Sequence, residues 1–281
     1  MKVVADCGST KTSWGCILDD TNSIRFTSRG YNPAYLSEEE MVEDMIASYP
    51  HGLNRDLVDG VYFYGAGIIP LLEPVMERVL SQVFPFAKTI VARSDLVGAC
   101  KALLGDERGF AAILGTGMNT CIYDGKKVEQ RVGSLGFVLG DEGSGAYIGR
   151  ILLRDYLRGN LSVYAQQRIQ DYLQLSDDEI IRKVYKEPMP NRFCASLCKL
   201  LDEEAMQHDD LYSLVRSAFD DFFSHVIMHY DGYQHYRFNA VGSIAYIFKG
   251  LLGEMLQERG MQMGVVLRDP LDGLINYHKN R

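Results

Sequence analysis

The sequence contains no apolar run that approaches the ~20 residues required for a membrane-spanning helix. It also lacks a basic stripe, because its formal net charge is −8, and this argues against nucleic acid or an anionic membrane as the main partner. The first residues, MKVVADCGST, are typical of a strand and a turn, without the apolar region and cleavage site of a signal peptide. We therefore expect a cytoplasmic protein that acts on a small molecule.

Cysteine pairs with C-x-x-C spacing are also missing. The six cysteines are scattered along the chain, at Cys7, Cys16, Cys100, Cys121, Cys194 and Cys198. Such spacing favours free thiols in a reducing cytoplasm over a disulfide framework or a metal site.

The first half of the chain alternates strand and helix patterns. Runs of β-type residues bounded by turn residues predict strands at 1–8, 13–20, 23–30, 59–67 and 89–96. Two helices are predicted between these strands, one from a capping box at Ser37–Glu40 and one from an apolar period in 70–84. This order is that of an α/β lobe with a mixed sheet.

The pattern then restarts at residues 109–125, with an apolar strand, a glycine-rich turn and a returning strand. When Asp6 is set against Leu114, CGSTKT lies over GTGMNT and Thr12 lies over Thr120. The shared plan predicts two related lobes, 1–105 and 106–281, with the boundary in the turn GDER.

The second lobe contains a helical insertion at about 144–230. Apolar spacing predicts its helices, including one over 193–206 and one over 211–230, and Ser176–Glu179 forms a second capping box. Strands return at 237–245 and 262–270, with a helix over 249–258 between them. A last helix at 271–280 could pack back on the first lobe.

The stretch DCGSTKT ends like a phosphate-binding P-loop but does not meet its requirements. A P-loop needs a glycine directly before its lysine and a helix after its threonine, whereas Thr10 precedes Lys11 and a strand follows Thr12. What remains is a β-hairpin whose tip can bind an anion through its amides and hydroxyls. Similar glycine turns occur at GTGMNT and at Gly242, and three such turns fit a nucleotide held between two lobes.

These segments resemble those of a known superfamily. DCGSTKT, ILGTGMNT and NAVGSIAYIF are similar to the phosphate-1, phosphate-2 and adenosine segments of the acetate and sugar kinases, actin and heat-shock chaperone ATPases. Further matches make the N-acetylglucosamine kinase and BadF/BadG/BcrA/BcrD ATPase-like family the most similar: Asn32, YGAG at 64–67, SDLVGA at 94–99 and GSLGFVLGDEGS at 133–144. The resemblance implies an α/β fold of two ribonuclease-H-like lobes with mixed sheets flanked by helices.

The resemblance also implies a role for each matching residue. Asp95 matches the catalytic base that accepts the proton of the sugar hydroxyl, and Asp6 matches a residue that contacts Mg²⁺ through water. The residues at ATP-binding positions are Gly8, Ser9, Thr10, Lys11, Thr12, Thr116, Gly117, Gly242 and Ser243. Those at sugar-binding positions are Asn32, Ala66, Met118, Asn119, Ser134, Leu135, Gly136 and Asp141. ATP, Mg²⁺, an amino-sugar substrate and a homodimer are therefore expected.

Several of these residues also have ordinary structural explanations. Asp95 or Ser94 could cap the helix that follows, Asp141 could be a solvated turn residue, and Asn32 could serve an Asn-Pro turn. His225 and His229 have metal-ligand spacing on one predicted helix, but apolar neighbours favour ordinary helix residues.

Two departures from the family leave the sugar open. Leu135 replaces a common tryptophan and Met118 replaces a usual serine, and both positions are expected to approach the sugar. N-acetylglucosamine, glucosamine and N-acetylmuramate therefore stay as alternatives. Two other functions compete with a kinase: an ATPase activator of a dehydratase or reductase, which would bridge an iron–sulfur cluster through cysteines, and a non-catalytic sugar or nucleotide sensor.

Overall fold

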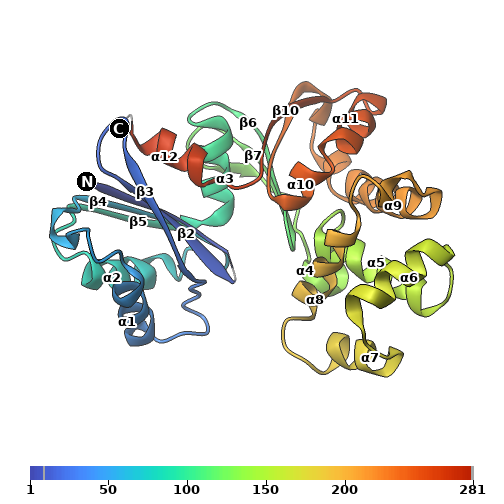
Figure 1. Cartoon of the computed structure of the whole chain (residues 1–281). Helices are drawn as coiled ribbons and strands as arrows, with labels where there is room; N and C mark the ends of the chain where they lie inside the picture. Colours follow the sequence, from blue (N-terminus) through green and yellow to red (C-terminus); the bar gives the residue numbers. More distant parts are fainter. Residues whose placement is uncertain (9, 280–281) are drawn as a thin grey trace. The chain divides into compact units, whose positions relative to one another are not determined.

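Two five-stranded sheets, one in each of two units of the chain, carry the fold (Figure 1). The computed structural model describes residues 1–8 and 10–279. The first unit consists of Met1–Arg108, Tyr123–Val128 and the chain from Asp269 on, and the second consists of Gly109–Ile122 and Glu129–Arg268. Both units are α/β, which confirms the predicted fold class of two lobes with mixed sheets.

The first sheet has the order β3-β2-β1-β4-β5, with β2 antiparallel to β1 and β3, and with β1, β4 and β5 parallel. Its strands are β1 (Lys2–Cys7), β2 (Lys11–Ile17), β3 (Ser23–Arg29), β4 (Gly60–Gly65) and β5 (Thr89–Ser94). The helices are α1 (Glu38–Ser48), α2 (Glu73–Val83), α3 (Asp95–Leu104) and α12 (Leu271–Lys279), with a 3₁₀ turn at Arg55–Leu57.

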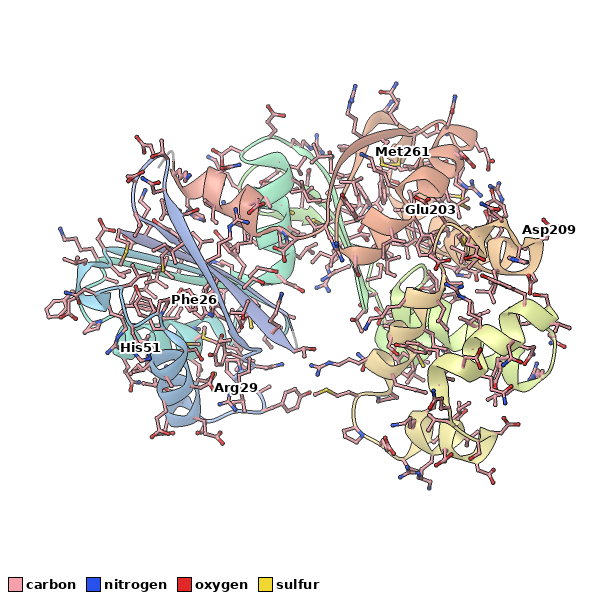
Figure 2. The ribbon with its side chains drawn as sticks, viewed as in Figure 1. Phe26, Arg29, His51, Glu203, Asp209 and Met261 are labelled. Carbon is pink, nitrogen blue, oxygen red and sulfur yellow. The ribbon has the colours of Figure 1, made fainter. Side chains whose placement is uncertain are left out.

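The two faces of this sheet follow from the alternation of side chains along β1. Val3, Ala5 and Cys7 pack in a core with α1 and α2, whereas Val4 packs with Leu274 of α12 on the opposite face. Figure 1 shows α1 and α2 on one side of the sheet and α3 and α12 on the other. The only tryptophan, Trp14, belongs to the first core, where it stacks on Phe26, labelled in Figure 2.

The second sheet repeats the same plan with the order β10-β9-β6-β7-β8. Its strands are β6 (Gly109–Leu114), β7 (Met118–Tyr123), β8 (Val128–Gln130), β9 (Arg237–Val241) and β10 (Gln262–Leu267). In each sheet the first strand is central, its two successors extend to one edge, and the last two extend to the other edge. The predicted relation between CGSTKT and GTGMNT therefore corresponds to equivalent turns, β1–β2 and β6–β7.

Helices cover the second sheet and form the insertion. They are α4 (Gly136–Leu139), α5 (Gly145–Leu157), α6 (Val163–Leu173), α7 (Asp177–Tyr185), α8 (Pro190–Ser196), α9 (Asp209–His225), α10 (Ser243–Ile247) and α11 (Lys249–Glu258). Short 3₁₀ turns lie at Leu197–Leu200, Ala205–Gln207, Ile227–His229 and Tyr233–His235. Both predicted capping boxes are confirmed, at Ser37–Glu40 and Ser176–Glu179.

Two predicted helices are wrong in extent. The helix expected over 193–206 ends at Ser196 and continues as separate 3₁₀ turns, and the helix expected over 211–230 ends at His225. His225 and His229 therefore do not share one helix. Within the described residues, no helix is both long enough and apolar enough to cross a membrane.

Candidate active site

The carboxyl end of β1 places Asp6 on the face of the first sheet that α3 and α12 cover. Asp6 lies opposite Ser13 in the register with β2 and is partly buried. Its pKa is raised to about 7, mainly by burial and then by the negative charges of Asp269 and Asp95, while Lys11 opposes the rise. A carboxylate in this position favours a cation beside it, because a positive charge would stabilise the ionised form that burial and the neighbouring carboxylates disfavour.

The turn between β1 and β2 carries the predicted phosphate ligands of the first unit. Its backbone is fixed by hydrogen bonds from Gly8 N–H to the Lys11 carbonyl (2.9 Å) and from Gly30 N–H to the Thr10 carbonyl (2.9 Å). The side chains of Thr10 and Lys11 are exposed and free to meet a ligand. Ser9, predicted here as well, lies outside the described residues.

Thr12 has to be reassigned from an ATP ligand to a structural residue. Its side chain is fully buried, and its hydroxyl lies 3.0 Å from Cys7 Sγ and donates to the Arg29 carbonyl at 2.8 Å. Alternation along β2 turns it toward the core of α1 and α2, the face opposite Asp6.

Asp95 is the first residue of α3, directly after β5. Ser94 is the N-cap of this helix and accepts a hydrogen bond from Val97 N–H at 3.4 Å, while Asp95 Oδ1 accepts one from Leu96 N–H at 2.8 Å. The capping role that the sequence left open therefore belongs to Ser94. Asp95 is partly buried at the carboxyl end of its strand, and its charge is close enough to raise the pKa of Asp6.

The structure brings together the two predicted sugar-side segments of the first unit. Asn32 Oδ1 accepts a hydrogen bond from Ala34 N–H at 2.9 Å, and the Asn32 amide packs against Gly67. A Cβ at Gly67 would lie 2.6 Å from Asn32 Nδ2 and would have to displace the amide, and the φ of 81° at Gly67 would strain any other residue. The neighbouring Ala66 N–H donates to the Cys7 carbonyl at 2.8 Å, which ties this loop to the end of β1. Asn32 thus serves a turn and also lies beside the predicted site.

The two glycine turns of the second unit lie side by side at the ends of β6 and β9. Gly115 N–H donates to the Gly117 carbonyl at 3.0 Å and closes the turn that exposes part of Thr116. Gly242 has a φ of 124°, and a Cβ there would lie 2.1 Å from the Leu114 carbonyl oxygen. Glycine is therefore required at this contact, and Ser243 follows as the exposed first residue of α10.

Asp141 joins three predicted sugar-side segments of the second unit. Its Oδ1 accepts a hydrogen bond from Met118 N–H at 3.2 Å, and its own N–H donates to the Ser134 carbonyl at 2.8 Å. The carboxylate also contacts Gly117, where a Cβ would lie 3.2 Å from Oδ2. Burial raises the pKa of Asp141, and the Met118 N–H opposes this rise. Asp141 is thus a buried acid fixed beside the β6–β7 turn and is not a solvated turn residue.

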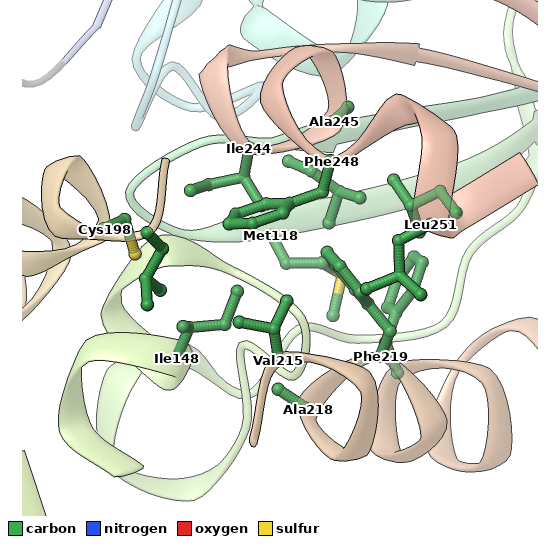
Figure 3. Packing of buried hydrophobic residues seen from close by; sticks show 14 of the residues in the cluster. Met118, Ile148, Cys198, Val215, Ala218, Phe219, Ile244, Ala245, Phe248 and Leu251 are labelled. Carbon is green, nitrogen blue, oxygen red and sulfur yellow. The ribbon is translucent and has the colours of Figure 1, made fainter. Parts of the chain in front are cut away.

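The two positions that depart from the family differ in their surroundings. The Met118 side chain is buried in the core of the second unit, near Ile148, Phe219 and Phe248 (Figure 3). The expectation that this side chain approaches the sugar is therefore wrong, because only its backbone N–H reaches Asp141. Leu135 is 70% exposed in the left-handed region (φ 55°), directly before Gly136, and it is available to contact a ligand.

Sequence reasoning missed two side chains beside Asn119. Arg131 Nε donates to Asn119 Oδ1 at 3.1 Å, and the Tyr230 hydroxyl contacts the residues that follow Asn119 and Arg131. No motif marks either residue. Only the pairing of β7 with β8 and the return of the chain after α9 bring them to this place.

A cavity of 610 Å³ in the second unit was also not predicted. It is lined by residues of α10, α11 and the segment after α8, among them Leu201, Glu203, Met206, Tyr246, Ile247 and Leu251. One of them, Tyr246, donates its backbone N–H to the Gly242 carbonyl at 3.0 Å. Figure 2 labels Glu203, whose exposed carboxylate borders the cavity. The volume lies in the range of nucleotide and drug-sized ligand sites, and the wall combines aromatic, aliphatic and acidic groups.

Comparison with solved structures shows likeness over the full chain. A candidate N-acetylglucosamine kinase from Porphyromonas gingivalis has a TM-score of 0.93 and 35% identity, with 100% of this chain and 99% of that chain covered. A candidate N-acetylglucosamine kinase from Chromobacterium violaceum has a TM-score of 0.75 and 17% identity, with 98% of each chain covered.

A ROK family glucokinase from Streptomyces griseus, in complex with glucose and AMPPNP, has a TM-score of 0.53 and 15% identity, with 98% and 97% covered. At these lower identities the second and third structures show the fold alone. No family model matches the sequence, and no curated protein matches it.

Proposed function

Because the chain belongs to the family of N-acetylglucosamine kinase and BadF/BadG/BcrA/BcrD ATPase-like proteins, we propose that it transfers the γ-phosphoryl group of ATP to a hydroxyl of an amino sugar. The observation that carries this proposal is the likeness at 35% identity over the whole chain to a candidate N-acetylglucosamine kinase. N-acetylglucosamine is accordingly the first substrate to test.

The glycine turns and the 610 Å³ cavity of the second unit support ATP as the donor. In our proposal the adenosine occupies this cavity, next to Tyr246 and Leu251, while the turn at Gly242 allows the ribose and phosphates to approach the end of β6. Thr116 would donate to a phosphate oxygen, as would Thr10 of the first unit. These residues bind and orient the nucleotide.

The donor set of the first unit fits Mg²⁺ bound mainly by ATP and water. Among the described residues, no group of three or more His, Cys, Asp or Glu side chains is able to hold a metal ion alone. Asp6 is a partly buried carboxylate repelled by Asp269 and Asp95, and so it would gain from a cation held on the phosphates. When bound, the ion would neutralise charge that develops on the transferred group.

Asp95 is the proposed general base. As the hydroxyl oxygen of the sugar forms its bond to the γ-phosphorus, the bond to the bridging oxygen breaks, ADP leaves, and Asp95 accepts the hydroxyl proton. Ser94 holds the start of α3 and so positions the carboxylate. Asn32, Asn119 and Asp141 are proposed to hold sugar hydroxyls, and Leu135 is proposed to contact the sugar.

The burial of the cysteines weighs against the dehydratase-activator alternative. All six are buried, whereas a cluster bridged between subunits needs cysteines at the surface. A non-catalytic sensor would not need a carboxylate at the position of Asp95, and the kinase proposal accounts for that residue.

The test is a coupled ADP-release assay with N-acetylglucosamine, glucosamine and N-acetylmuramate. Asp95→Asn should lower kcat by at least ~10²-fold while ATP binding persists, because it removes only the proton acceptor. Asp56→Asn, which changes an exposed aspartate of the same unit, is the matched control. Turnover by Asp95→Asn at the rate of the control would remove Asp95 from this role, and the absence of sugar-dependent ADP release in the unmodified protein would refute the proposal.

A further inference from the structure

The hydrogen bond between Arg131 and Asn119 fixes which end of the Asn119 amide is available to a ligand. Arg131 Nε donates to Asn119 Oδ1 at 3.1 Å. A guanidinium N–H can only donate, so the partner atom must be the amide oxygen, and the NH₂ group points away from Arg131. An asparagine without such a partner can turn its amide by 180° and present either a donor or an acceptor.

A buried tyrosine holds the two backbone segments that carry this pair. The Tyr230 hydroxyl accepts a hydrogen bond from Val132 N–H at 2.9 Å and pairs with Thr120 Oγ1 at 2.8 Å. Thr120 follows Asn119 directly, and Val132 follows Arg131 directly. Tyr230 is 1% exposed and packs edge-on against Phe110, so its hydroxyl is a fixed reference point for both segments.

The exposure of Arg131 argues that its bond to Asn119 does little for folding. Arg131 lies at the surface, where a single hydrogen bond or ion pair contributes little to the free energy of unfolding. A charge-assisted bond is nevertheless strong enough to hold one side-chain orientation over another. The bond between Arg131 and Asn119 therefore decides which end of the Asn119 amide faces a ligand.

Resting on the proposed function, we propose that Arg131 is a positioning residue of the sugar site, which makes Asn119 a donor toward the acceptor sugar. Asn119 would then donate its NH₂ to a sugar oxygen, while Asp141 accepts from a sugar hydroxyl. Tyr230 keeps the two segments in register, so that the donor from Asn119 and the acceptor from Asp141 stay complementary to one sugar face.

A double-mutant cycle tests this role. Arg131→Met should raise the KM for N-acetylglucosamine by about 5- to 20-fold, with a smaller change in kcat, because binding is weakened alike in the ground state and the transition state. In an Asn119→Ala background the same change should have no further effect, since the amide that Arg131 orients is gone. Equal effects of Arg131→Met in the two backgrounds, or an unchanged KM, would overturn the proposal.

Two further variants separate orientation from general disturbance. Arg131→Lys should restore most of the affinity, because an ammonium group can donate to the same oxygen. Asn119→Asp should be as impaired as Asn119→Ala, because the carboxylate keeps the bond to Arg131 but has no NH₂ to give the sugar. A sugar KM for Asn119→Asp near that of the unmodified protein would show that the oxygen contacts the sugar, and would refute the inference.

The controls distinguish this inference from the proposed function. Arg158→Met, which removes the exposed arginine at the C-cap of α5 in the same unit, should leave the sugar KM unchanged. If the unmodified protein phosphorylates N-acetylglucosamine but the cycle shows no coupling, only the role of Arg131 fails. If no amino sugar is phosphorylated at all, the proposed function fails and this inference fails with it.

Discussion

Acid should destabilise the first unit through His278, a buried histidine on α12. The side chain is 4% exposed, its ring stacks on Tyr62 with centroids 3.9 Å apart, and its Nε2 lies 2.9 Å from the Tyr64 hydroxyl. Its pKa is lowered from 6.5 to about 3, mainly by burial and then by the positive charges of Lys101 and Lys2. The folded unit therefore excludes a proton that the unfolded chain binds.

The size of the effect follows from the two pKa values. Since the pKa is lower in the folded state, the contribution is complete above the unfolded value of 6.5 and is lost as the pH falls toward about 3. Each pH unit in this window costs about 1.4 kcal/mol of unfolding free energy. Lowering the pH from 7.5 to 5 should therefore cost about 2 kcal/mol through His278 alone.

Asp6, in the same unit, has the opposite effect on the free energy of unfolding when the pH is lowered. Its pKa is raised to about 7, so its contribution is complete below the unfolded value of 3.8 and is lost as the pH rises through 7. The pH dependence of the unmodified protein is thus a difference between two opposing effects of similar size. A variant that removes only the histidine is needed to separate them.

Urea unfolding followed by the fluorescence of Trp14 provides the assay. Trp14 is the only tryptophan and is buried in the first unit, so its signal reports the unit that contains His278. Between pH 7.5 and pH 5, the unmodified protein should lose about 2 kcal/mol more stability, or gain that much less, than His278→Gln. His229→Gln, an exposed histidine, should follow the unmodified protein. A difference below about 0.5 kcal/mol between the pH dependences of the unmodified protein and His278→Gln would refute the reasoning.

Three further predictions concern the candidate site. Gly242→Ala should weaken ATP binding at least tenfold by calorimetry, because its Cβ would meet the Leu114 carbonyl, whereas Gly52→Ala has open space away from the cavity and should bind ATP normally. Thr12→Val should lower the free energy of unfolding in urea by about 1–2 kcal/mol and leave ATP affinity unchanged. Thr10→Val should instead weaken ATP binding and leave stability unchanged. Weaker ATP binding by Thr12→Val would restore the ligand role of Thr12. Leu135→Trp should alter the ratio of kcat/KM values among hexosamines without changing Tm, and an unchanged ratio would mean that this exposed side chain does not meet the sugar.

The periodicity of the sequence was sufficient to predict most of the fold. Strands with β-type residues and helices with capping boxes appear where expected, because local preference and tertiary packing agree there. They disagree after His225, where apolar spacing continues but the helix stops. The chain has to turn there so that Tyr230 can bond to Thr120 and Val132, and a contact with β7, about 110 residues earlier in the chain, leaves no local signal.

A similar contact ends α8 early. The backbone of Cys194 approaches Gly149 of α5 so closely that a Cβ at Gly149 would lie 1.9 Å from the Cys194 carbonyl oxygen. Just beyond, the Cys198 thiol donates to the Gly145 carbonyl at 3.3 Å from within a 3₁₀ turn. Packing between α8 and α5 therefore decides this backbone, and the apolar period of the segment is compatible with either arrangement.

The motifs located the candidate site but did not show which side chains reach it. Met118 and Thr12 lie inside the quoted segments. The Met118 side chain packs in the core of the second unit, however, and the buried Thr12 hydroxyl bonds to Arg29 within the first sheet. Arg131 lies outside every motif and contacts Asn119. Motif spacing indicates which turns approach a ligand, whereas the side a residue faces depends on strand register, which the sequence specifies only through alternation.

Alternation also explains what the two related turns share. Thr12 of β2 and Thr120 of β7, which the sequence alignment sets against each other, are both fully buried, with hydroxyls bonded to Arg29 and Tyr230 respectively. Because neighbouring residues of a strand face opposite sides, the residue before each threonine must point to the other face. In the first unit this residue is Lys11, whose charge acts on Asp6, and in the second it is Asn119, which Arg131 orients. The buried threonine anchors the returning strand in each unit, and the side chain before it points to the other face of its own sheet.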